Sequence, residues 1–249
     1  MANSFPLFPF ITQKWEDLFF LHWPIPESVL KPTLPHDLQV DLFEGRAWIS
    51  VVAFKLKKLR IFPLRQLPWN DFLEVNLRTY VIGPDGQKGV WFYSLDSSDF
   101  LATWGARLLF GLPYYKSDIS MFQETTRHVW ESRRKTFGGS VSASISAQTT
   151  FSDVSGCKKL LSDFLLERYC FWGKRKASYS SSPSFVKHPP YDPVGLKDAR
   201  YSGDLFCAQG LEEPDCPPVL SHYCRGFEVV ASPPPWVSRM DGQTNHNIV

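Results

Sequence analysis

The segment from Phe72 to Val81 constrains the fold more than any other part of the chain, because apolar and polar residues alternate along it. An alternation with a period of two is typical of a β-strand whose two faces meet different surroundings. Either the polar face meets water, or it lines a barrel interior, where side chains about 7 Å apart would orient a small polar ligand. One face carries Leu73, Val75, Leu77, Thr79 and Val81, and the polar face carries Glu74, Asn76, Arg78 and Tyr80.

The rest of the chain predicts one domain that is α+β but mainly β. About ten short strand patterns alternate with turn residues, and few helical patterns interrupt them. Two hairpins are predicted, the first with Leu38–Phe43 and Arg46–Leu56 around Glu44-Gly45, the second with Phe72–Ile82 and Gly89–Leu95. Strands of this number are expected to close into an antiparallel barrel or to form two packed sheets, with a few peripheral helices. The domain is predicted to span residues 12–232, with 1–11 and 233–249 as flexible tails.

The clearest helical pattern follows the second hairpin and ends at Gly111. Ser97 or Ser98 is predicted to cap it. Asp96 either pairs with an arginine, Arg78 or Arg107, or helps to cap the helix, and its place directly before the two serines favours capping. One face of this helix carries Phe100, Leu101, Trp104 and Leu108.

A second helical pattern spans about Cys157 to Glu167, with an apolar stripe at Leu160, Leu161, Phe164 and Leu165. Two charge clusters, Glu167-Arg168 and Arg133-Arg134-Lys135, are interpreted as solvated surfaces.

Charge and composition exclude several classes of protein. The 27 basic and 25 acidic residues give a net charge of +2, which is too small for a nucleic-acid binder. No apolar run is long enough to span a membrane, and the first residues lack the pattern of a signal peptide, so we expect a soluble protein and no membrane partner. The five cysteines include no CxxC pair, which indicates reduced thiols in a cytoplasmic protein.

Seven segments, taken in order, resemble the motifs of a known family. They are Leu21-His22-Trp23-Pro24, Phe43-Glu44-Gly45-Arg46-Ala47-Trp48, the segment 74–81, the segment 89–96, Phe110-Gly111-Leu112-Pro113-Tyr114, Phe164-Leu165-Leu166-Glu167-Arg168-Tyr169 and His188-Pro189-Pro190. This order is similar to that of the YqjF-like family of uncharacterised proteins (domain of unknown function 2071), over roughly Trp15 to Val230. The family is distantly similar to acetoacetate decarboxylase. The resemblance implies the β-barrel of that enzyme and a cavity lined by a glutamate and an arginine.

The sequence departs from the decarboxylase at its reactive lysine. Acetoacetate decarboxylase forms a Schiff base through a Gly-aromatic-Pro-Lys-Lys motif, in which the second lysine lowers the pKa of the first. The corresponding stretch here is Gly111-Leu112-Pro113-Tyr114-Tyr115-Lys116, so that tyrosines stand at both lysine positions. Lys116 shares a strand face with Tyr114 and is a candidate nucleophile, although no second cation adjoins it. The alternative is a solvated lysine at a strand end.

Two histidines complete the set of candidates. His22 would act as an acid or base near neutral pH, or else form a hydrogen-bonded part of the core. His188 would close the cavity mouth or fix a turn. The catalytic candidates are therefore Glu74, Lys116 and His22, and the ligand-binding candidates are Glu74, Asn76, Arg78, Tyr80 and Tyr114. No nucleotide, serine-hydrolase or zinc-protease motif occurs, and neither a cofactor nor a metal is implied.

Two functions from different classes follow. In the first, the barrel binds a small polar or anionic molecule, such as an organic acid or an acyl compound, through Arg78, with or without turnover. In the second, the chain is a non-enzymatic scaffold or protein-interaction module that retains the barrel and fills it with aromatic side chains. The first requires an enclosed, partly polar pocket beside Glu74 and Arg78. The oligomeric state is not predicted.

Overall fold

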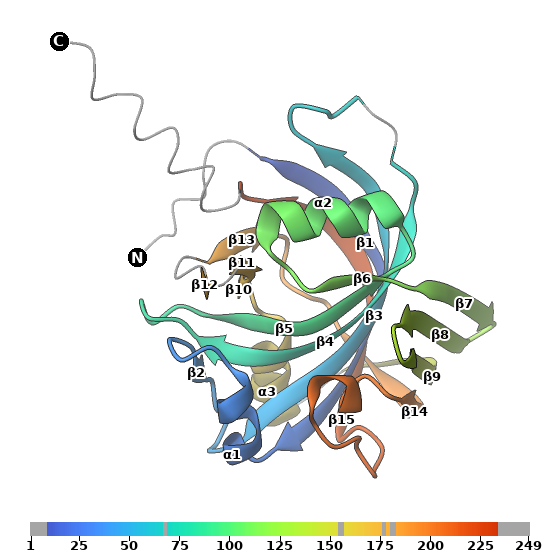
Figure 1. Ribbon diagram of the computed structural model, residues 1–249. Helices are drawn as coiled ribbons and strands as arrows, with labels where there is room; N and C mark the ends of the chain where they lie inside the picture. Colours follow the sequence, from blue (N-terminus) through green and yellow to red (C-terminus); the bar gives the residue numbers. More distant parts are fainter. Residues whose placement is uncertain (1–8, 67–68, 154–156, 176–177, 180–182, 234–249) are drawn as a thin grey trace.

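Seven strands close a barrel in the computed structural model, which describes residues 9–66, 69–153, 157–175, 178–179 and 183–233 (Figure 1). All neighbouring pairs are antiparallel except β5 with β10, and β15 returns to pair with β1, so the ring is closed. Closure leaves these seven strands without a free edge. The predicted antiparallel barrel is thereby confirmed. In ring order the strands are β1 (Ile11–Ile25), β3 (Ala47–Ile61), β4 (Phe72–Ile82), β5 (Lys88–Ser97), β10 (Cys170–Trp172), β13 (Ser184–Lys187) and β15 (Leu220–Ala231).

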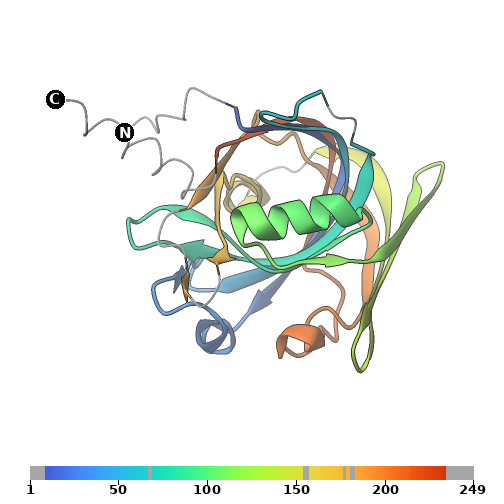
Figure 2. The ribbon, with the colours of Figure 1, turned by 45° about the horizontal axis from the view of Figure 1, so that its top comes forward.

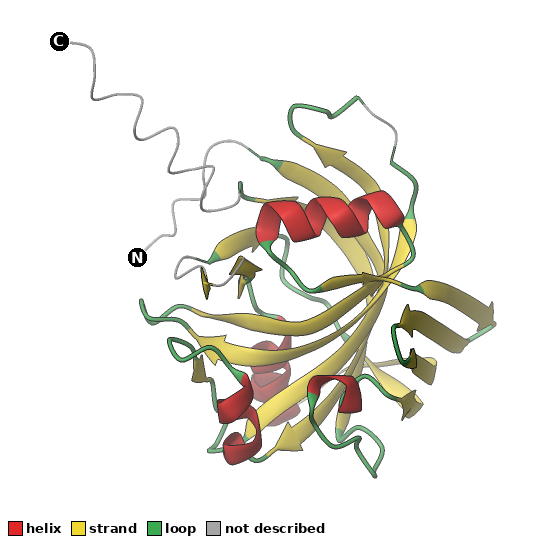
Figure 3. Cartoon of the chain, in the orientation of Figure 1, coloured by secondary structure: helices red, strands yellow, loops and turns green. Residues whose placement is uncertain are grey.

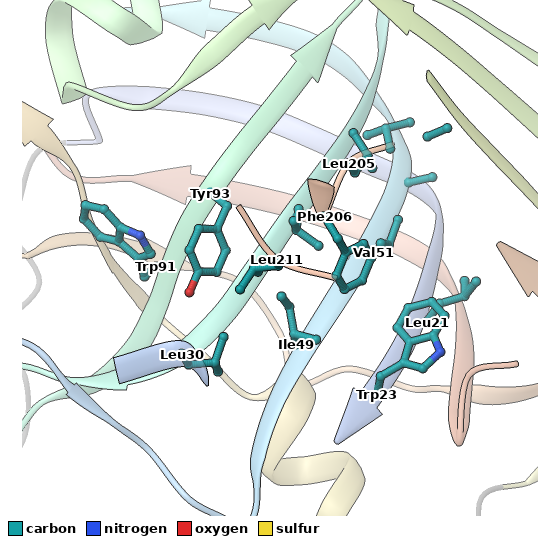
Figure 4. Packing of buried hydrophobic residues seen from close by; sticks show 14 of the residues in the cluster. Leu21, Trp23, Leu30, Ile49, Val51, Trp91, Tyr93, Leu205, Phe206 and Leu211 are labelled. Carbon is teal, nitrogen blue, oxygen red and sulfur yellow. The ribbon is translucent and has the colours of Figure 1, made fainter. Parts of the chain in front are cut away.

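Four further strands continue from β15 and cover part of the outside of the barrel. They are β14 (Val194–Gly203), β9 (Gly139–Asp153), β8 (Arg127–Thr136) and β7 (Asp118–Glu124). Trp130 and Ile145 of this extension belong to the same apolar cluster as Val51 of β3 and Leu77 of β4. Figure 4 shows side chains of this cluster along β3, beside the segment that follows β14. The cluster buries the outer face of β1, β3 and β4.

Of the two predicted hairpins, one is confirmed and one is wrong. β4 and β5 form the second predicted hairpin, which is confirmed. The first is wrong in its pairing, because the strand before Glu44-Gly45 pairs with β4, and only the Phe43–Arg46 bridge spans that turn. Strands dominate the molecule, as Figure 3 shows. The short strands are β2 (Gln39–Val40), β6 (Tyr114–Lys116), β11 (Lys174–Arg175) and β12 (Ser178–Tyr179).

Helices cover the two ends of the barrel. In Figures 1 and 2, α2 (Phe100–Phe110) lies across one end, and α3 (Cys157–Leu166) lies behind it toward the other. The other helical segments are α1 (Glu27–Leu30) and two 3₁₀ turns, Lys31–Thr33 and Cys207–Gln209. None of the helices in the described ranges has the length and apolar character needed to cross a membrane.

The start of α2 differs from the prediction. Ser97 is the last residue of β5, and the Ser98 hydroxyl accepts a hydrogen bond from the Leu73 backbone N–H at 2.9 Å. Asp99 is therefore the residue that caps α2, accepting a hydrogen bond from the Ala102 N–H at 2.7 Å. Gly111 ends the helix at a φ of 65°, as predicted.

The two faces of α2 have unequal surroundings. Ala102 and Thr103 are buried toward the barrel. Four apolar side chains are largely exposed, at 57% for Phe100, 62% for Leu101, 58% for Trp104 and 75% for Leu108. The half-buried Leu109 and Phe110 face the barrel cavity together with smaller side chains.

Both faces of β4 are buried. Its apolar face packs under the extension strands, and its polar face points into the barrel among a second apolar cluster that includes Phe20 and Val52. The interpretation in which the polar face meets water is wrong, because closure of the barrel encloses that face. Glu74, Asn76, Arg78 and Tyr80 are only 2%, 3%, 8% and 0% exposed.

Candidate functional site

A cavity of about 150 Å³ lies inside the barrel beneath α2. Of the 32 residues that line it, most are aliphatic or aromatic, and those with charged or amide side chains are Gln13, Glu74, Asn76, Arg78 and Arg168. Tyr114 also lines the cavity, so four of the five predicted ligand-binding residues meet there. A cavity of this volume accommodates roughly six to ten non-hydrogen atoms, since an engineered apolar cavity of about 150 Å³ binds benzene.

Glu74 lies on the cavity wall with both carboxylate oxygens hydrogen-bonded. The Tyr114 hydroxyl donates to Oε2 at 2.8 Å, and the Asn76 amide donates to Oε1 at 3.1 Å. Burial raises the pKa of Glu74 to about 7, against the opposing effect of these two hydrogen bonds. Glu74 therefore exchanges a proton close to neutral pH, which suits a group that donates to a ligand or accepts from it.

Arg78 brings a buried positive charge to the same cavity. Its Nη2 lies 3.4 Å from the Leu165 carbonyl oxygen, and its guanidinium carbon lies 5.3 Å from the centre of the Phe20 ring. Among the described residues, no carboxylate lies within 4.0 Å of this guanidinium, and its Nε has no hydrogen-bond partner. Buried charges are normally paired, because desolvation of an unpaired charge is costly. The guanidinium is thus placed to bind an anion.

Other polar atoms around the cavity also lack partners within the described part of the chain. They are Asn76 Oδ1, Trp15 Nε1 and Trp69 Nε1, which are buried and belong to lining residues. A buried polar group without a hydrogen bond costs about 1–3 kcal/mol unless water or a ligand satisfies it. With Arg78 Nε, the cavity therefore offers both donors and an acceptor to an occupant.

The predicted ligand residue Tyr80 and the predicted catalytic residue His22 belong to a different group, here called the histidine cluster. It consists of Tyr80, Ser50, His22, His222 and Ser162, all buried. Hydrogen bonds join them in a chain, with separations of 2.7 Å for Tyr80–Ser50, 2.7 Å for Ser50–His22, 3.1 Å for His22–His222 and 2.8 Å for His222–Ser162. None of the five lines the cavity.

Both histidines of the cluster are neutral. Burial, together with the neighbouring His222 and Arg78, lowers the pKa of His22 well below its usual value. Burial lowers the pKa of His222 to about 4. The structure therefore places His22 as a hydrogen-bonded residue of the interior, and not beside Glu74 in the cavity wall.

Lys116 lies apart from Glu74 and Arg78. Its side chain is 42% exposed, and its Nζ donates to the Ser117 carbonyl oxygen at 2.9 Å and lies 3.7 Å from an Asp118 oxygen. The cavity lining contains no lysine, so the described structure offers no group there for a Schiff base.

His188 is also outside the cavity lining. Its ring stacks on Tyr169 and Phe227, with centroid separations of 4.6 and 4.7 Å, and its Nδ1–H donates to the Pro189 carbonyl oxygen at 2.7 Å. These contacts favour the interpretation in which His188 fixes a turn.

Two buried ion pairs were not predicted from the sequence. Asp96 was expected to cap α2, which is wrong, because it pairs with Arg134 at 2.8 Å inside the protein. Arg168 pairs with Asp41 at 2.7 Å, and its side chain, like that of Arg134, is only 4% exposed. The interpretation of these two arginines as solvated is therefore wrong. For Arg168, its place in the family motif 164–169 was the available signal.

The cavity offers only a few kinds of chemical group. It offers one cation for an anionic group, one carboxyl that exchanges a proton near neutral pH, and apolar walls. No group of three or more His, Cys, Asp or Glu side chains within the described ranges is placed to hold a metal ion. That the protein uses no cofactor stays a prediction.

The sequence matches a family and a curated protein that are both described as uncharacterised. The family model DUF2071, described as an uncharacterized conserved protein, matches residues 12–228. The uncharacterized protein YqjF of Bacillus subtilis (strain 168) is 32% identical over 225 residues, which cover 89% of this chain and 90% of that protein.

Solved structures similar to the barrel come from acetoacetate decarboxylase-like proteins. An acetoacetate decarboxylase-like enzyme from Sphingomonas wittichii RW1 matches with a TM-score of 0.56 and 13% identity, over 91% of this chain and 93% of that one. Acetoacetate decarboxylase from Legionella pneumophila matches with a TM-score of 0.55 and 14% identity, over 93% of this chain and 88% of that one. The enduracididine biosynthesis enzyme MppR, complexed with pyruvate, matches with a TM-score of 0.54 and 13% identity, over 93% of this chain and 91% of that one. These likenesses concern the fold, whereas the sequence matches show that the chain belongs to the DUF2071 family of uncharacterised, YqjF-like proteins.

Proposed function

We propose that this protein binds a small carboxylic acid or a similar organic anion in the barrel cavity, with Arg78 holding the anionic group. The observation that carries the proposal is the buried Arg78 guanidinium, which has no carboxylate partner in the described part of the chain and lines the barrel cavity. A charge-assisted hydrogen bond from arginine to a carboxylate would repay the cost of burying this cation.

The neighbours of Arg78 supply orientation. Asn76 presents a free oxygen, and Glu74 in its neutral form presents a hydroxyl, so each accepts or donates a hydrogen bond to a further polar group on the ligand. Tyr114 holds Glu74 in position. The fold relative MppR, whose structure contains pyruvate, supports a small carboxylate as ligand of such a barrel.

Free thiols support a cytoplasmic location as part of this proposal. The described cysteines Cys170, Cys207, Cys216 and Cys224 are unpaired. Unpaired thiols are typical of proteins that work in a reducing compartment.

A thermal-shift screen of small carboxylates and keto acids tests the proposal. A ligand at about 100 times its Kd stabilises the native state by roughly 2.7 kcal/mol, so a binding acid raises Tm by several degrees. We expect Arg78→Ala to abolish that rise. Arg127→Ala, which removes an exposed arginine of β8, is the matched control and should keep it.

The result that would overturn the proposal is an equal rise in Tm for wild type and a folded Arg78→Ala variant. If Arg78→Ala does not fold, Arg78→Gln keeps most of the side-chain volume while removing the charge. Loss of the rise in Arg78→Gln supports the proposal, and retention of it contradicts the proposal.

One observation favours the alternative, a protein-interaction module. The outer face of α2 exposes Phe100, Leu101, Trp104 and Leu108, and exposed apolar clusters mark interaction surfaces in many proteins. A screen without any stabilising acid, combined with loss of self-association or partner binding in Trp104→Gln, would favour this alternative over ligand binding.

A further inference from the structure

The charged and amide groups of the cavity are unevenly distributed, since three of the five lie on β4 and the other two are Gln13 of β1 and Arg168. On β4, Asn76 and Arg78 are at least nine-tenths buried and each has an unpartnered polar atom within the described structure. The strands across the ring from β4 contribute Phe171, Val186 and Ala231. A ligand that fills this space therefore needs one polar side and one apolar side.

The roof of the cavity is apolar as well, and it leaves space. The residues of α2 that line the cavity are Leu101, Ala102, Gly105, Ala106, Leu109 and Phe110, whereas Trp104 and Leu108 of the same helix lie exposed on the outside. A Cβ atom added at Gly105 would meet no other atom within 4 Å. Because Gly105 carries no side chain, α2 leaves space at this position of the roof.

Apolar space of this kind is a poor site for water. Water inside a protein needs two to four hydrogen-bond partners, and cavities lined by aliphatic and aromatic groups stay dry but accept hydrocarbon. The apolar part of the cavity is thus suited to the hydrocarbon part of a ligand whose anionic group meets Arg78.

We infer that the ligand is an amphipathic monocarboxylic acid of about five to eight carbon atoms, which the cavity volume admits. Its carboxylate binds Arg78, and its hydrocarbon part lies under α2 against Ala102 and Gly105. This inference rests on the proposed function and narrows it, because it excludes acids that are polar at both ends. It also assigns α2 the role of selecting for the hydrocarbon part.

The affinities of a homologous series test the inference. We would measure Kd by isothermal titration calorimetry for acetate, butanoate, hexanoate, octanoate and decanoate with the full-length protein. Each methylene that becomes buried should tighten binding about fourfold, up to the length that fills the cavity. Hexanamide, which lacks the charge, and adipate, which carries a second charge, should each bind at least about tenfold more weakly than hexanoate.

Variants of α2 locate the hydrocarbon part. Gly105→Leu places a side chain in the roof and should weaken hexanoate binding by about tenfold or more while leaving acetate binding unchanged. Leu108→Gln, on the exposed face of the same helix, is the matched control and should change neither affinity. If Gly105→Leu does not fold, Ala106→Val replaces it and should likewise weaken hexanoate binding.

The outcomes separate this inference from the proposed function. Equal affinities along the series, lost together in Arg78→Ala, would leave the proposed function standing and overturn the hydrocarbon subsite. The hydrocarbon subsite would also be overturned if neither Gly105→Leu nor Ala106→Val changed the affinity for hexanoate. If no acid binds, the proposed function and the inference both fail.

Discussion

The barrel encloses two polar groups of residues that differ in how completely their atoms are hydrogen-bonded. In the histidine cluster, every ring nitrogen of His22 and His222 has a partner within 3.1 Å. In the cavity wall, Asn76 and Arg78 each keep a buried polar atom without a partner in the described chain. Complete pairing indicates a structural role, because nothing is left for a ligand to satisfy. Incomplete pairing around the cavity supports the proposal that a ligand binds there.

The helices beside the two groups, α3 and α2, differ in how completely their side chains are buried. Leu165 and Leu166 of α3 are 0% and 2% exposed, and Ser162 of the same helix joins the histidine cluster. On α2, only Ala102 and Thr103 are buried and Leu109 and Phe110 are half-buried, so this helix buries none of its large apolar side chains completely. We expect α2 to open more readily than α3, since local opening is easiest where few apolar contacts are lost.

The largest expected effect comes from breaking the histidine cluster. His222→Phe keeps the ring volume but leaves His22 Nε2 without its partner and removes a hydrogen bond from Ser162. We expect the free energy of unfolding to fall by about 2–4 kcal/mol, measured by urea denaturation.

A substitution in the cavity wall is the control for this experiment. Asn76→Leu removes an amide oxygen that has no described partner and one hydrogen bond, from the Asn76 amide to Glu74 Oε1, so the free energy of unfolding should fall by only about 1 kcal/mol. Equal losses of stability in the two variants would contradict the distinction between the two polar groups.

The next effect concerns pH and Glu74. The pKa of Glu74 is about 7 in the folded protein because burial raises it from 4.5, so folding favours the neutral carboxyl. Its contribution to stability is fully present below about pH 4.5 and is lost as the pH rises through about 7. Relative to Glu74→Gln, the wild type should therefore lose about 2–3 kcal/mol of unfolding free energy between about pH 5 and about pH 8.

The same titration should appear in ligand binding. A charged Glu74 repels the carboxylate of a ligand in the same cavity, so affinity for an acid should fall, by about tenfold, as the pH rises from about 6 to about 8. Glu74→Gln should remove most of this pH dependence. Parallel pH profiles for wild type and variant would show that Glu74 does not titrate in the cavity.

Local patterns predicted many of the strands, the family resemblance implied the barrel, and four of the cavity-lining residues, Glu74, Asn76, Arg78 and Tyr114, were predicted as ligand contacts. The alternation along 72–81 separates Glu74 and Arg78 from the apolar face, and the turn at Gly83-Pro84-Asp85-Gly86 defines the β4–β5 hairpin. The alternation alone left two interpretations open for the polar face. Only closure of the ring through β1 and β15, strands about 200 residues apart, decides between them.

The features that escaped prediction depend on contacts between distant residues. Asp41 and Arg168 are separated by 127 positions, and Asp96 and Arg134 by 38, so no local pattern pairs them. His22 and His222 are 200 positions apart, which is why Tyr80 was taken for a ligand contact and His22 for a catalytic candidate. Tyr80 has the same strand parity as Arg78, but Ser50 of β3 engages its hydroxyl.

The smallest expected effect tests that reassignment of Tyr80. Tyr80→Phe removes the hydroxyl that bonds to Ser50, at a cost of about 0.5–1.5 kcal/mol in unfolding free energy. Because Tyr80 does not line the cavity, the affinity for hexanoate should stay within about twofold of the wild-type value, whereas Arg78→Ala should abolish binding. Urea denaturation and calorimetry on the two variants measure both quantities. A tenfold or larger loss of affinity in Tyr80→Phe would show that this tyrosine contributes to the ligand site. Stability and binding would then depend on the same hydroxyl, and the distinction between the histidine cluster and the cavity wall would be wrong.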